Sequence, residues 1–305
     1  MEKAIVIKST GSWYIVRLED GRSVECRIRG KFRMEGIRTT NPVAVGDIVQ
    51  VEENQDGYVI TAIDKRKNYI IRKSTNLSKE SHILASNVDQ ALLIVTVGHP
   101  VTSTVFIDRF LASAEAYNIP VVLLFNKSDL YDEEDRALYG GLSAIYEKIG
   151  YPCYEVSALT GKNIPLVRQL LKDKITVLSG LSGVGKSSLI NRLEPGLELK
   201  TAVISDAHDS GKHTTTFAEM FCLSGGGYLI DTPGIRSFGT VDMKKEEISH
   251  FFPEIFAKAS ECRFYNCTHT HEPGCAVIEA VGQDEISESR YASYLSMLEE
   301  SGKYR

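Results

Sequence analysis

The stretch Gly180-Leu181-Ser182-Gly183-Val184-Gly185-Lys186-Ser187 decides the fold of this 305-residue chain. It fits the pattern G-x-x-x-x-G-K-[ST], whose glycines let backbone N–H groups turn inward around phosphates. The apolar run 175–178 precedes it, and a helical pattern containing Leu189 and Ile190 follows it, which is the strand–loop–helix setting that the motif requires. We therefore expect a phosphate-binding loop in which Lys186 lies between terminal phosphates and Ser187 binds Mg²⁺.

Apolar runs and helical patterns alternate around this loop. Helical patterns lie near 104–117, 132–148 and 163–171, and the apolar runs are 91–97, 121–125, 154–156, 175–178, 217–223 and 228–230. Such alternation predicts an α/β fold with a mostly parallel sheet, which we place at residues 71–240.

The first 70 residues have a different pattern, with short strand-like runs separated by turn signals. There are five such runs: Ile5–Ile7, Trp13–Leu18, Val24–Ile28, Asp47–Val51 and Tyr58–Ile63. Five short strands predict a small β-barrel over residues 1–70; an OB-fold is the commonest candidate and an SH3-like barrel the alternative. Residues 64–83 are polar and are expected to form a linker or mobile loop.

Charge is distributed unevenly along the chain. Residues 1–73 hold 14 basic and 10 acidic residues, whereas the whole chain has a net charge of −5. A basic N-terminal domain favours a polyanionic partner, although random drift in surface charge gives the same count. The run Arg27-Ile28-Arg29-Gly30-Lys31-Phe32-Arg33 suits RNA phosphate contact and stacking; the alternative is a solvated barrel loop.

The overall composition excludes several classes of protein. Hydrophobic residues make up 43% and charged residues 25% of the chain, which argues against a mostly disordered chain or a fibrous rod. No apolar stretch approaches the roughly 18–20 residues of a membrane span, and residues 1–8 lack the apolar core of a signal peptide. We therefore expect a cytoplasmic protein that is monomeric and does not bind membranes.

Three of the six cysteines crowd together near the C-terminus. Cys262, Cys267 and Cys275 lie within fourteen residues, with His269 and His271 among them. A closed Cys₃His set suits one structural Zn²⁺, whereas a catalytic zinc keeps a position open; small core cysteines are the alternative. We expect residues 241–305 to form a mostly helical zinc-binding domain that ends in a helix at about 285–300.

The segment Asn126-Lys127-Ser128-Asp129 directly follows the apolar run 121–125. The sequence N-K-x-D at a strand end resembles the guanine-recognition motif of translation-factor-type GTPases. A carboxylate such as that of Asp129 accepts both the ring N–H and the amine N–H of guanine, whereas adenine offers it a bare acceptor. Asn126 is expected to bridge the base and the phosphate loop, and the Lys127 stem to lie along the ring.

Two further motifs follow strand-like runs. Ser157-Ala158 resembles the S-A-x motif that supports the guanine keto oxygen, with a plain strand-to-helix turn as the alternative. Asp231-Thr232-Pro233-Gly234 fits D-x-x-G, in which Asp231 holds Mg²⁺ through water and the Gly234 N–H senses the third phosphate. The base-recognition motifs precede the phosphate loop, and the switch motifs come last, which is a circular permutation of the usual order.

The order of barrel, permuted GTPase and Cys₃His segment closely resembles the bacterial family of ribosome small-subunit-dependent GTPase A (RsgA, also YjeQ). Matching stretches include Ile107–Leu111, Asn126–Leu130, Gly180–Leu189, Gly211–Thr216, Asp231–Arg236 and Cys262–Cys275. The resemblance implies a GTP hydrolase that acts late in maturation of the small ribosomal subunit, contacts its rRNA and is stimulated by the subunit.

The resemblance also implies roles for individual residues. It selects His269 over His271 as a zinc ligand, and Thr215, beside Ser187 and Asp231, as a magnesium ligand. It gives a set of GTP-binding residues: Asn126, Lys127, Ser128, Asp129, Ser157, Ala158, Gly180, Leu181, Ser182, Gly183, Val184, Gly185, Lys186, Ser187, Ser188, Asp231 and Gly234.

The residue that orients the attacking water is not evident. Ile235 stands where Ras-like enzymes carry a glutamine, so we expect slow intrinsic hydrolysis and a partner that completes the site. His213 is a candidate to place the water beside the catalytic residues Lys186 and Thr215, and a purely structural histidine is the alternative. The competing functions are a GTP-dependent switch on another target, such as tRNA, and an RNA-binding module with a vestigial nucleotide site.

Overall fold

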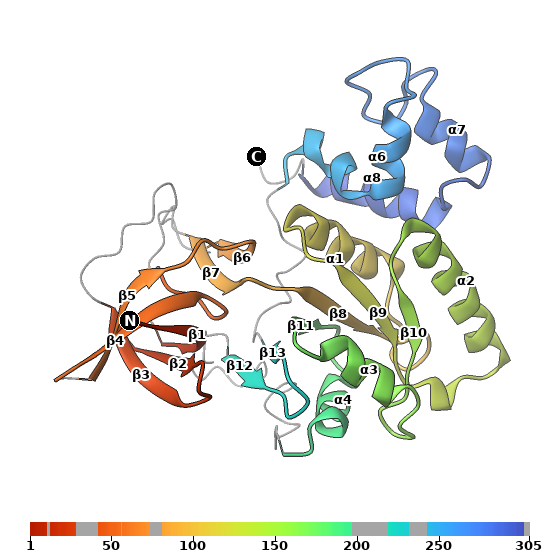
Figure 1. Ribbon diagram of the computed structural model, residues 1–305. Coiled ribbons are helices and arrows are strands. Elements are labelled where there is room, and N and C mark those ends of the chain that lie inside the picture. Colours follow the sequence, from red (N-terminus) through yellow and green to blue (C-terminus); the bar gives the residue numbers. More distant parts are fainter. Residues whose placement is uncertain are drawn as a thin grey trace, which may run out of the picture. The chain divides into compact units, whose positions relative to one another are not determined.

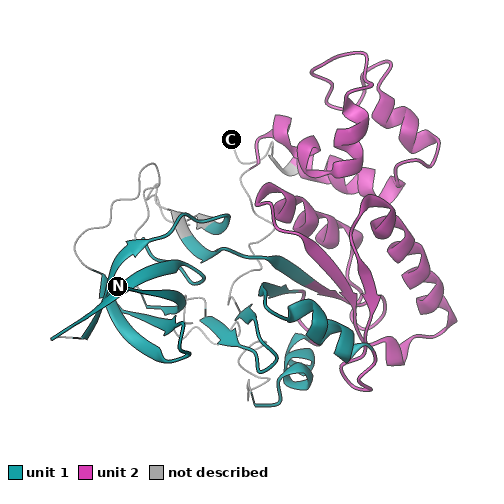
Figure 2. Cartoon of the chain, viewed as in Figure 1, with its two compact units in different colours: residues 1–92, 163–179, 186–235 teal, residues 93–162, 180–185, 236–305 magenta. Residues whose placement is uncertain are grey.

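A computed structural model describes residues 1–10, 13–28, 42–55, 57–73, 81–196, 219–231 and 243–301, with the backbone alone at 72–73, 81–82, 231 and 300–301. The chain forms two compact units (Figures 1 and 2). Unit 1 holds residues 1–92, 163–179 and 186–235, and unit 2 holds residues 93–162, 180–185 and 236–305. The chain therefore passes between the units several times.

The N-terminal part of unit 1 is a closed five-stranded barrel. Its strands are β1 (Glu2–Ser9), β2 (Tyr14–Leu18), β3 (Ser23–Ile28), β4 (Ile48–Asn54) and β5 (Gly57–Ile63). The pairings run β1–β2–β3–β5–β4 and return to β1, with β3 and β5 parallel and the other pairs antiparallel. Alternate side chains, among them Val6, Val16, Val49 and Ile60, fill the interior without solvent exposure. The predicted barrel is confirmed, and its strand order is that of an OB-fold.

The segment after the barrel differs from the prediction. Strands β6 (Tyr69–Lys73) and β7 (Ser81–Ser86) pair antiparallel, so the expectation of a linker or mobile loop over 64–83 is wrong for the described residues. The Arg66 side chain is 4% exposed and donates to both carboxylate oxygens of Asp47, at 2.6 and 2.5 Å. Ser86 Oγ also donates to Asp47, at 2.6 Å. The polar sequence misled because its charge is neutralised in a buried ion pair instead of facing water.

Unit 1 also carries half of the α/β fold. Strand β11 (Ile175–Ser179) pairs in parallel with β13 (Tyr228–Asp231), which pairs antiparallel with β12 (Glu219–Cys222). Strand β12 continues to β1 of the barrel through Lys8 and Glu219, whose side chains form an ion pair at 3.0 Å. Helices α3 (Ile164–Leu171) and α4 (Lys186–Leu193) pack against each other beside these strands.

Unit 2 carries the other half. Its strands lie in the order β10 (Cys153–Glu155), β9 (Val121–Phe125), β8 (Gln90–Val95), the last of which begins in unit 1. Every residue of β8 and β9 is buried, as in a strand covered on both faces. Helices α1 (Thr104–Ala116) and α2 (Glu133–Ile149) connect the strands, so the predicted α/β pattern is confirmed.

The C-terminal segment of unit 2 is helical, as predicted. It contains the 3-10 helix η3 (Lys245–Phe251) and helices α6 (Pro253–Ala259), α7 (Ala276–Gly282) and α8 (Glu288–Ser301). These helices share one hydrophobic cluster with Ala112 of α1, and α8 packs along α1. No helix in the described ranges has both the length and the apolar character needed to span a bilayer.

Candidate functional site

The phosphate loop joins the end of strand β11 to the start of helix α4. Residues 180–185 form the turn, and Lys186 and Ser187 are the first two residues of the helix, both half-buried. Arg168 of α3 donates to the carbonyl oxygens of Arg192 and Leu193 at the far end of α4, at 3.0 and 3.4 Å, and so fixes this helix. The strand–loop–helix setting required by the motif is therefore present.

Asn126 joins the phosphate loop to the loop that follows β10. Its side chain, in a residue only 1% exposed, donates from Nδ2 to the Val184 carbonyl at 2.8 Å and accepts at Oδ1 from the Ala158 N–H at 3.1 Å. Gly185 has φ +95°, and a Cβ there would come within 2.4 Å of Asn126 Nδ2, so this position requires glycine. The structure thus brings three of the predicted motif segments together inside unit 2.

Asp129 is exposed and lies in the 3-10 turn η1 (Ser128–Leu130), which follows β9. Ser157 Oγ donates to its Oδ1 and accepts from the Thr160 N–H at 3.0 Å, which fixes the carboxylate. The Ser128 N–H donates to the Val156 carbonyl at 3.2 Å. A fixed, solvent-facing carboxylate is the arrangement that a guanine edge requires.

Lys127 adopts a left-handed backbone conformation with φ 64°, and its Nζ donates to the His99 carbonyl at 2.6 Å. This contact joins the N-K-x-D segment to the loop between β8 and α1. The pattern of the sequence gave no sign that residues 96–103 belong to the site.

The switch residues are less completely described. Asp231 is the last residue of β13, whose carboxyl end lies beside that of β11 because the two strands are parallel. Its backbone is therefore at the edge where the phosphate loop begins. Six residues with predicted roles lie outside the described residues: His213, Thr215, Gly234, and Arg29, Lys31 and Arg33 of the basic run.

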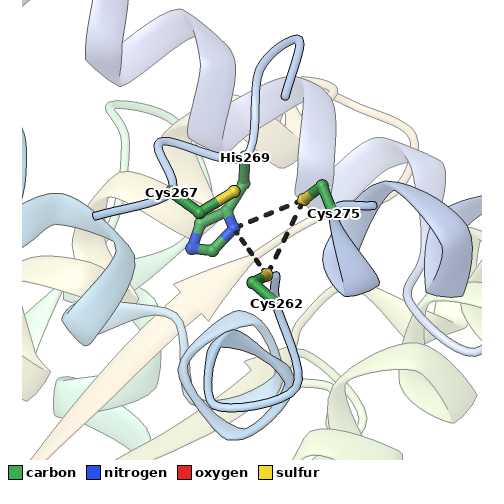
Figure 3. Close-up of side chains that lie close together, drawn as sticks. All are labelled: Cys262, Cys267, His269 and Cys275. Atoms are coloured by element: carbon green, nitrogen blue, oxygen red, sulfur yellow. Dashed lines mark hydrogen bonds between the residues drawn. The ribbon is translucent and has the colours of Figure 1, made fainter. Parts of the chain in front are cut away.

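The C-terminal cluster brings together Cys262, Cys267, His269 and Cys275 (Figure 3). Their ligand atoms all lie within 4.8 Å of one another; His269 Nδ1 is 3.6 Å from Cys262 Sγ and 3.5 Å from Cys275 Sγ. A tetrahedral zinc with ordinary bond lengths separates its ligands by roughly 3.4–3.8 Å. The donor set and its spacing therefore fit a structural metal.

His271 does not join the cluster. It is exposed, and its Nδ1 lies 2.8 Å from Thr270 Oγ1. Between the two histidines, the geometry selects His269, whose carbonyl accepts from the Tyr291 hydroxyl at 2.6 Å. Such outer contacts orient a metal-binding loop.

Electrostatics around this loop also suit a cation. Burial lowers the pKa of His269, which keeps the imidazole neutral and able to ligate. Burial would raise the pKa of Glu272, but donation from the Thr268 hydroxyl and from the N–H groups of Thr268, His271 and Thr270 lowers it overall. Glu272 therefore holds the loop as a carboxylate outside the ligand set.

Residues of the buried charge network were missed by sequence reasoning. Arg290 and Glu254 pair in the interior of unit 2, although a single arginine in an amphipathic helix gives no sign of burial. Asp108, the second carboxylate that pairs with Arg290, lies within the family-like stretch Ile107–Leu111, which was the one available signal.

Comparisons with known proteins agree over the whole chain. The family model of the RsgA GTPase matches residues 63–241, and that of the RsgA N-terminal domain matches residues 3–59. A protein of Bacteroides fragilis named small ribosomal subunit biogenesis GTPase RsgA is 61% identical over 99% of both chains. One of the same name from Flavobacterium psychrophilum is 54% identical over 97% of this chain and 92% of its own.

Two solved structures are similar as well. YjeQ from Thermotoga maritima superimposes with a TM-score of 0.83 at 38% identity, covering 100% of this chain and 99% of its own. YloQ, described as a circularly permuted GTPase, gives a TM-score of 0.77 at 31% identity, with coverage of 100% and 96%. With the barrel, the permuted order of motifs and the matched models in agreement, this chain belongs to the RsgA GTPase family of GTP hydrolases.

Proposed function

We propose that this protein hydrolyses GTP to GDP and phosphate and acts as a late maturation factor of the small ribosomal subunit, which stimulates the hydrolysis. The observation that carries the nucleotide part is the double hydrogen bonding of Asn126, to Val184 of the phosphate loop and to Ala158. The subunit as partner is supported by the relatives named for small ribosomal subunit biogenesis. In this proposal residues 1–70 bind rRNA, 71–240 bind GTP and 241–305 hold zinc.

The predicted site residues divide the work of hydrolysis. Asp129 selects guanine, Asn126 and the Ser157-Ala158 loop support the base, and residues 180–188 surround the phosphates. The Lys186 ammonium offsets the negative charge that the terminal phosphates carry in the transition state. Ser187, Thr215 and Asp231 are the proposed holders of Mg²⁺, which when bound neutralises charge on the β- and γ-phosphates.

Efficient positioning of the attacking water requires the partner to complete the site. Ile235 has no polar group that can orient water, so the chain alone is expected to turn over slowly, with His213 as the proposed residue that places the water. The bound subunit then supplies or fixes what the isolated chain lacks.

The decisive experiment is steady-state GTP hydrolysis by the full chain, with and without purified small ribosomal subunits, accompanied by co-sedimentation with GDP or a non-hydrolysable GTP analogue. Stimulation by small subunits, together with tighter association in the analogue-bound state, supports the proposal. Stimulation by tRNA instead would favour the other-target switch, and absence of nucleotide binding would favour an RNA-binding module.

We further propose that Cys262, Cys267, His269 and Cys275 hold one structural zinc. Cys262→Ser should reduce bound zinc from about one equivalent to near none, because a hard hydroxyl replaces a thiolate. The loss should lower the thermal midpoint of unfolding, since metal-binding free energy contributes to folding. Elemental analysis with calorimetry measures both quantities; Cys222→Ser, outside the cluster, is the matched control, and an unchanged zinc content in Cys262→Ser contradicts the assignment.

We also propose that the run from Arg27 to Arg33 contacts rRNA. Arg27 begins this run on β3, where its guanidinium lies 3.9 Å from the ring centroid of Trp13, itself 43% exposed. Substituting Arg27, Arg29, Lys31 and Arg33 together by glutamine should weaken RNA binding and flatten its salt dependence by roughly three to four counterions. Titrations at several salt concentrations measure the slope, and a slope equal to that of the parent protein excludes this run.

A further inference from the structure

A buried charge network joins the nucleotide-binding half of unit 2 to its C-terminal helices. Arg290 of α8 and Asp108 of α1 are both 0% exposed, and Arg290 Nη1 donates to Asp108 Oδ1 at 2.8 Å. Tyr146 of α2 donates to the same oxygen at 3.0 Å. Arg290 also donates to Glu254 of α6 through Nε and Nη2, at 2.7 and 3.1 Å. The guanidinium of α8 therefore joins α1 and α6, and Asp108 extends the network to α2.

Burying these charged groups costs free energy unless each of them has a partner of opposite charge. The Arg290 guanidinium lies over the Phe252 ring, 4.6 Å from the centroid, in an apolar surrounding where an unpaired charge is strongly disfavoured. Burial opposes the charge on Arg290, but the carboxylates of Asp108 and Glu254 raise the pKa of its guanidinium overall. The planar guanidinium donates two bonds to Glu254 and one to Asp108 at once, which a lysine ammonium cannot reproduce. The geometry of α1 against α8 is therefore closely specified.

On one side, helix α1 is continuous with the loop that contacts the nucleotide-binding motifs. Ser103 caps the helix by accepting from the Phe106 N–H at 3.3 Å, and Thr102 Oγ1 accepts from the Thr96 N–H at 3.1 Å. The His99 carbonyl in this loop accepts a hydrogen bond from the Lys127 ammonium. It also reaches the phosphate loop, because a Cβ added to Gly183 would lie 3.5 Å from Pro100 Cδ.

On the other side, helix α8 is bonded to the metal-binding loop. The residue after Arg290, Tyr291, donates its hydroxyl to the His269 carbonyl at 2.6 Å, and Tyr294 donates to the Thr268 carbonyl at 2.8 Å. The contacts that connect the metal-binding loop to Lys127, through α8, α1 and the loop 96–103, all lie within unit 2.

We propose that Asp108 and Arg290 are positioning residues for the nucleotide site: by holding helix α1 they keep the loop 96–103 against Lys127 and Gly183, so that the C-terminal metal-bearing segment sets the affinity for guanine nucleotide. This inference rests on the proposed guanine site. Because coupling between two sites is reciprocal in binding free energy, bound GDP must also tighten the binding of metal at the Cys₃His loop.

The test compares release of a fluorescent GDP analogue from the zinc-loaded full chain and from its Asp108→Asn and Arg290→Lys variants. Both variants should release the analogue about tenfold faster, within the usual range of coupling between sites. Tyr151→Phe is the matched control: it removes one 2.9 Å bond to Glu115, in the last turn of the same helix, and should change release by less than about twofold. If one of these variants fails to fold, Tyr146→Phe replaces it, because this substitution removes only one hydrogen bond to Asp108. It should also release the GDP analogue faster than the parent protein does.

A second readout separates positioning from stability. At equilibrium with a competing chelator, the parent protein should retain more zinc with GDP than without it, and this difference should be lost in Asp108→Asn. A variant with a lower melting temperature but parental GDP release and a parental effect of GDP on zinc retention overturns the inference. If the parent protein itself fails to bind GDP, or Asp129→Asn binds it as tightly as the parent, the guanine site is wrong and the proposed function fails first.

Discussion

Lys186→Ala is expected to abolish measurable GTP turnover, both alone and with small ribosomal subunits. Lys186 starts α4 directly after the glycine turn, and its ammonium is the cation that we propose for the phosphates. Removal of one preorganised charge that acts on a transition state lowers kcat by about 10²–10³-fold. Because the intrinsic rate is already expected to be slow, a loss of this size takes turnover below detection.

The control for this substitution is Lys172→Ala, which removes an exposed ammonium at the end of α3 outside all of the motifs. Single-turnover hydrolysis with radiolabelled GTP at saturating nucleotide separates lost chemistry from weakened binding. Hydrolysis by Lys186→Ala at the rate of the Lys172→Ala protein would remove Lys186 from the catalytic machinery.

Asp129→Asn should lose most of its affinity for GTP and gain affinity for the xanthine nucleotide. The carboxylate that Ser157 fixes accepts two N–H groups of guanine, whereas an asparagine amide must turn one N–H donor toward another donor. Hydrogen bonds to a charged group contribute about 1.5–3 kcal/mol each and neutral ones about 1 kcal/mol. Losing one charge-assisted bond and replacing the other by a neutral bond therefore weakens GTP binding by roughly 10–10³-fold. Xanthine carries a carbonyl in place of the amine and accepts from that amide.

Competition titrations with GTP, ATP and the xanthine nucleotide measure this change of preference. Glu133→Gln removes an equal charge four residues away on the exposed start of α2, so it controls for the local potential. An Asp129→Asn protein that keeps the parental order of affinities would show that base recognition lies elsewhere.

Local sequence patterns were sufficient to predict those parts of the fold and of the site in which residues close in sequence share one strand end, turn or tight spacing. The phosphate loop, the N-K-S-D segment and the cysteine cluster each combine a strand end or a tight spacing with residue types that few other structures require. The barrel strands were also readable, because alternate burial leaves a period of two in the sequence.

Ion pairs and hydrogen bonds between residues distant in sequence could not be predicted from the sequence. Arg66 and Asp47 looked like solvent-facing charges, and Arg290 looked like one polar position of a surface helix, yet both arginines are buried against carboxylates distant in sequence. The role of His99 as acceptor for Lys127 depends on a backbone carbonyl, which leaves no mark on residue type. Such contacts depend on how elements meet, which a single sequence does not encode locally.

The ladder from β1 to β12 has a consequence for how this architecture can be divided. Since β1 of the barrel pairs with β12, which itself pairs with β13, unit 1 contains one continuous sheet from the barrel to Asp231, the first residue of the D-x-x-G segment. Excising the barrel would leave β12 without its neighbour β1 and expose an unpaired strand edge that favours self-association. Chimaeras between homologues should therefore exchange residues 1–92 and 219–231 as a matched set, because β1 and β12 pair through Lys8 and Glu219.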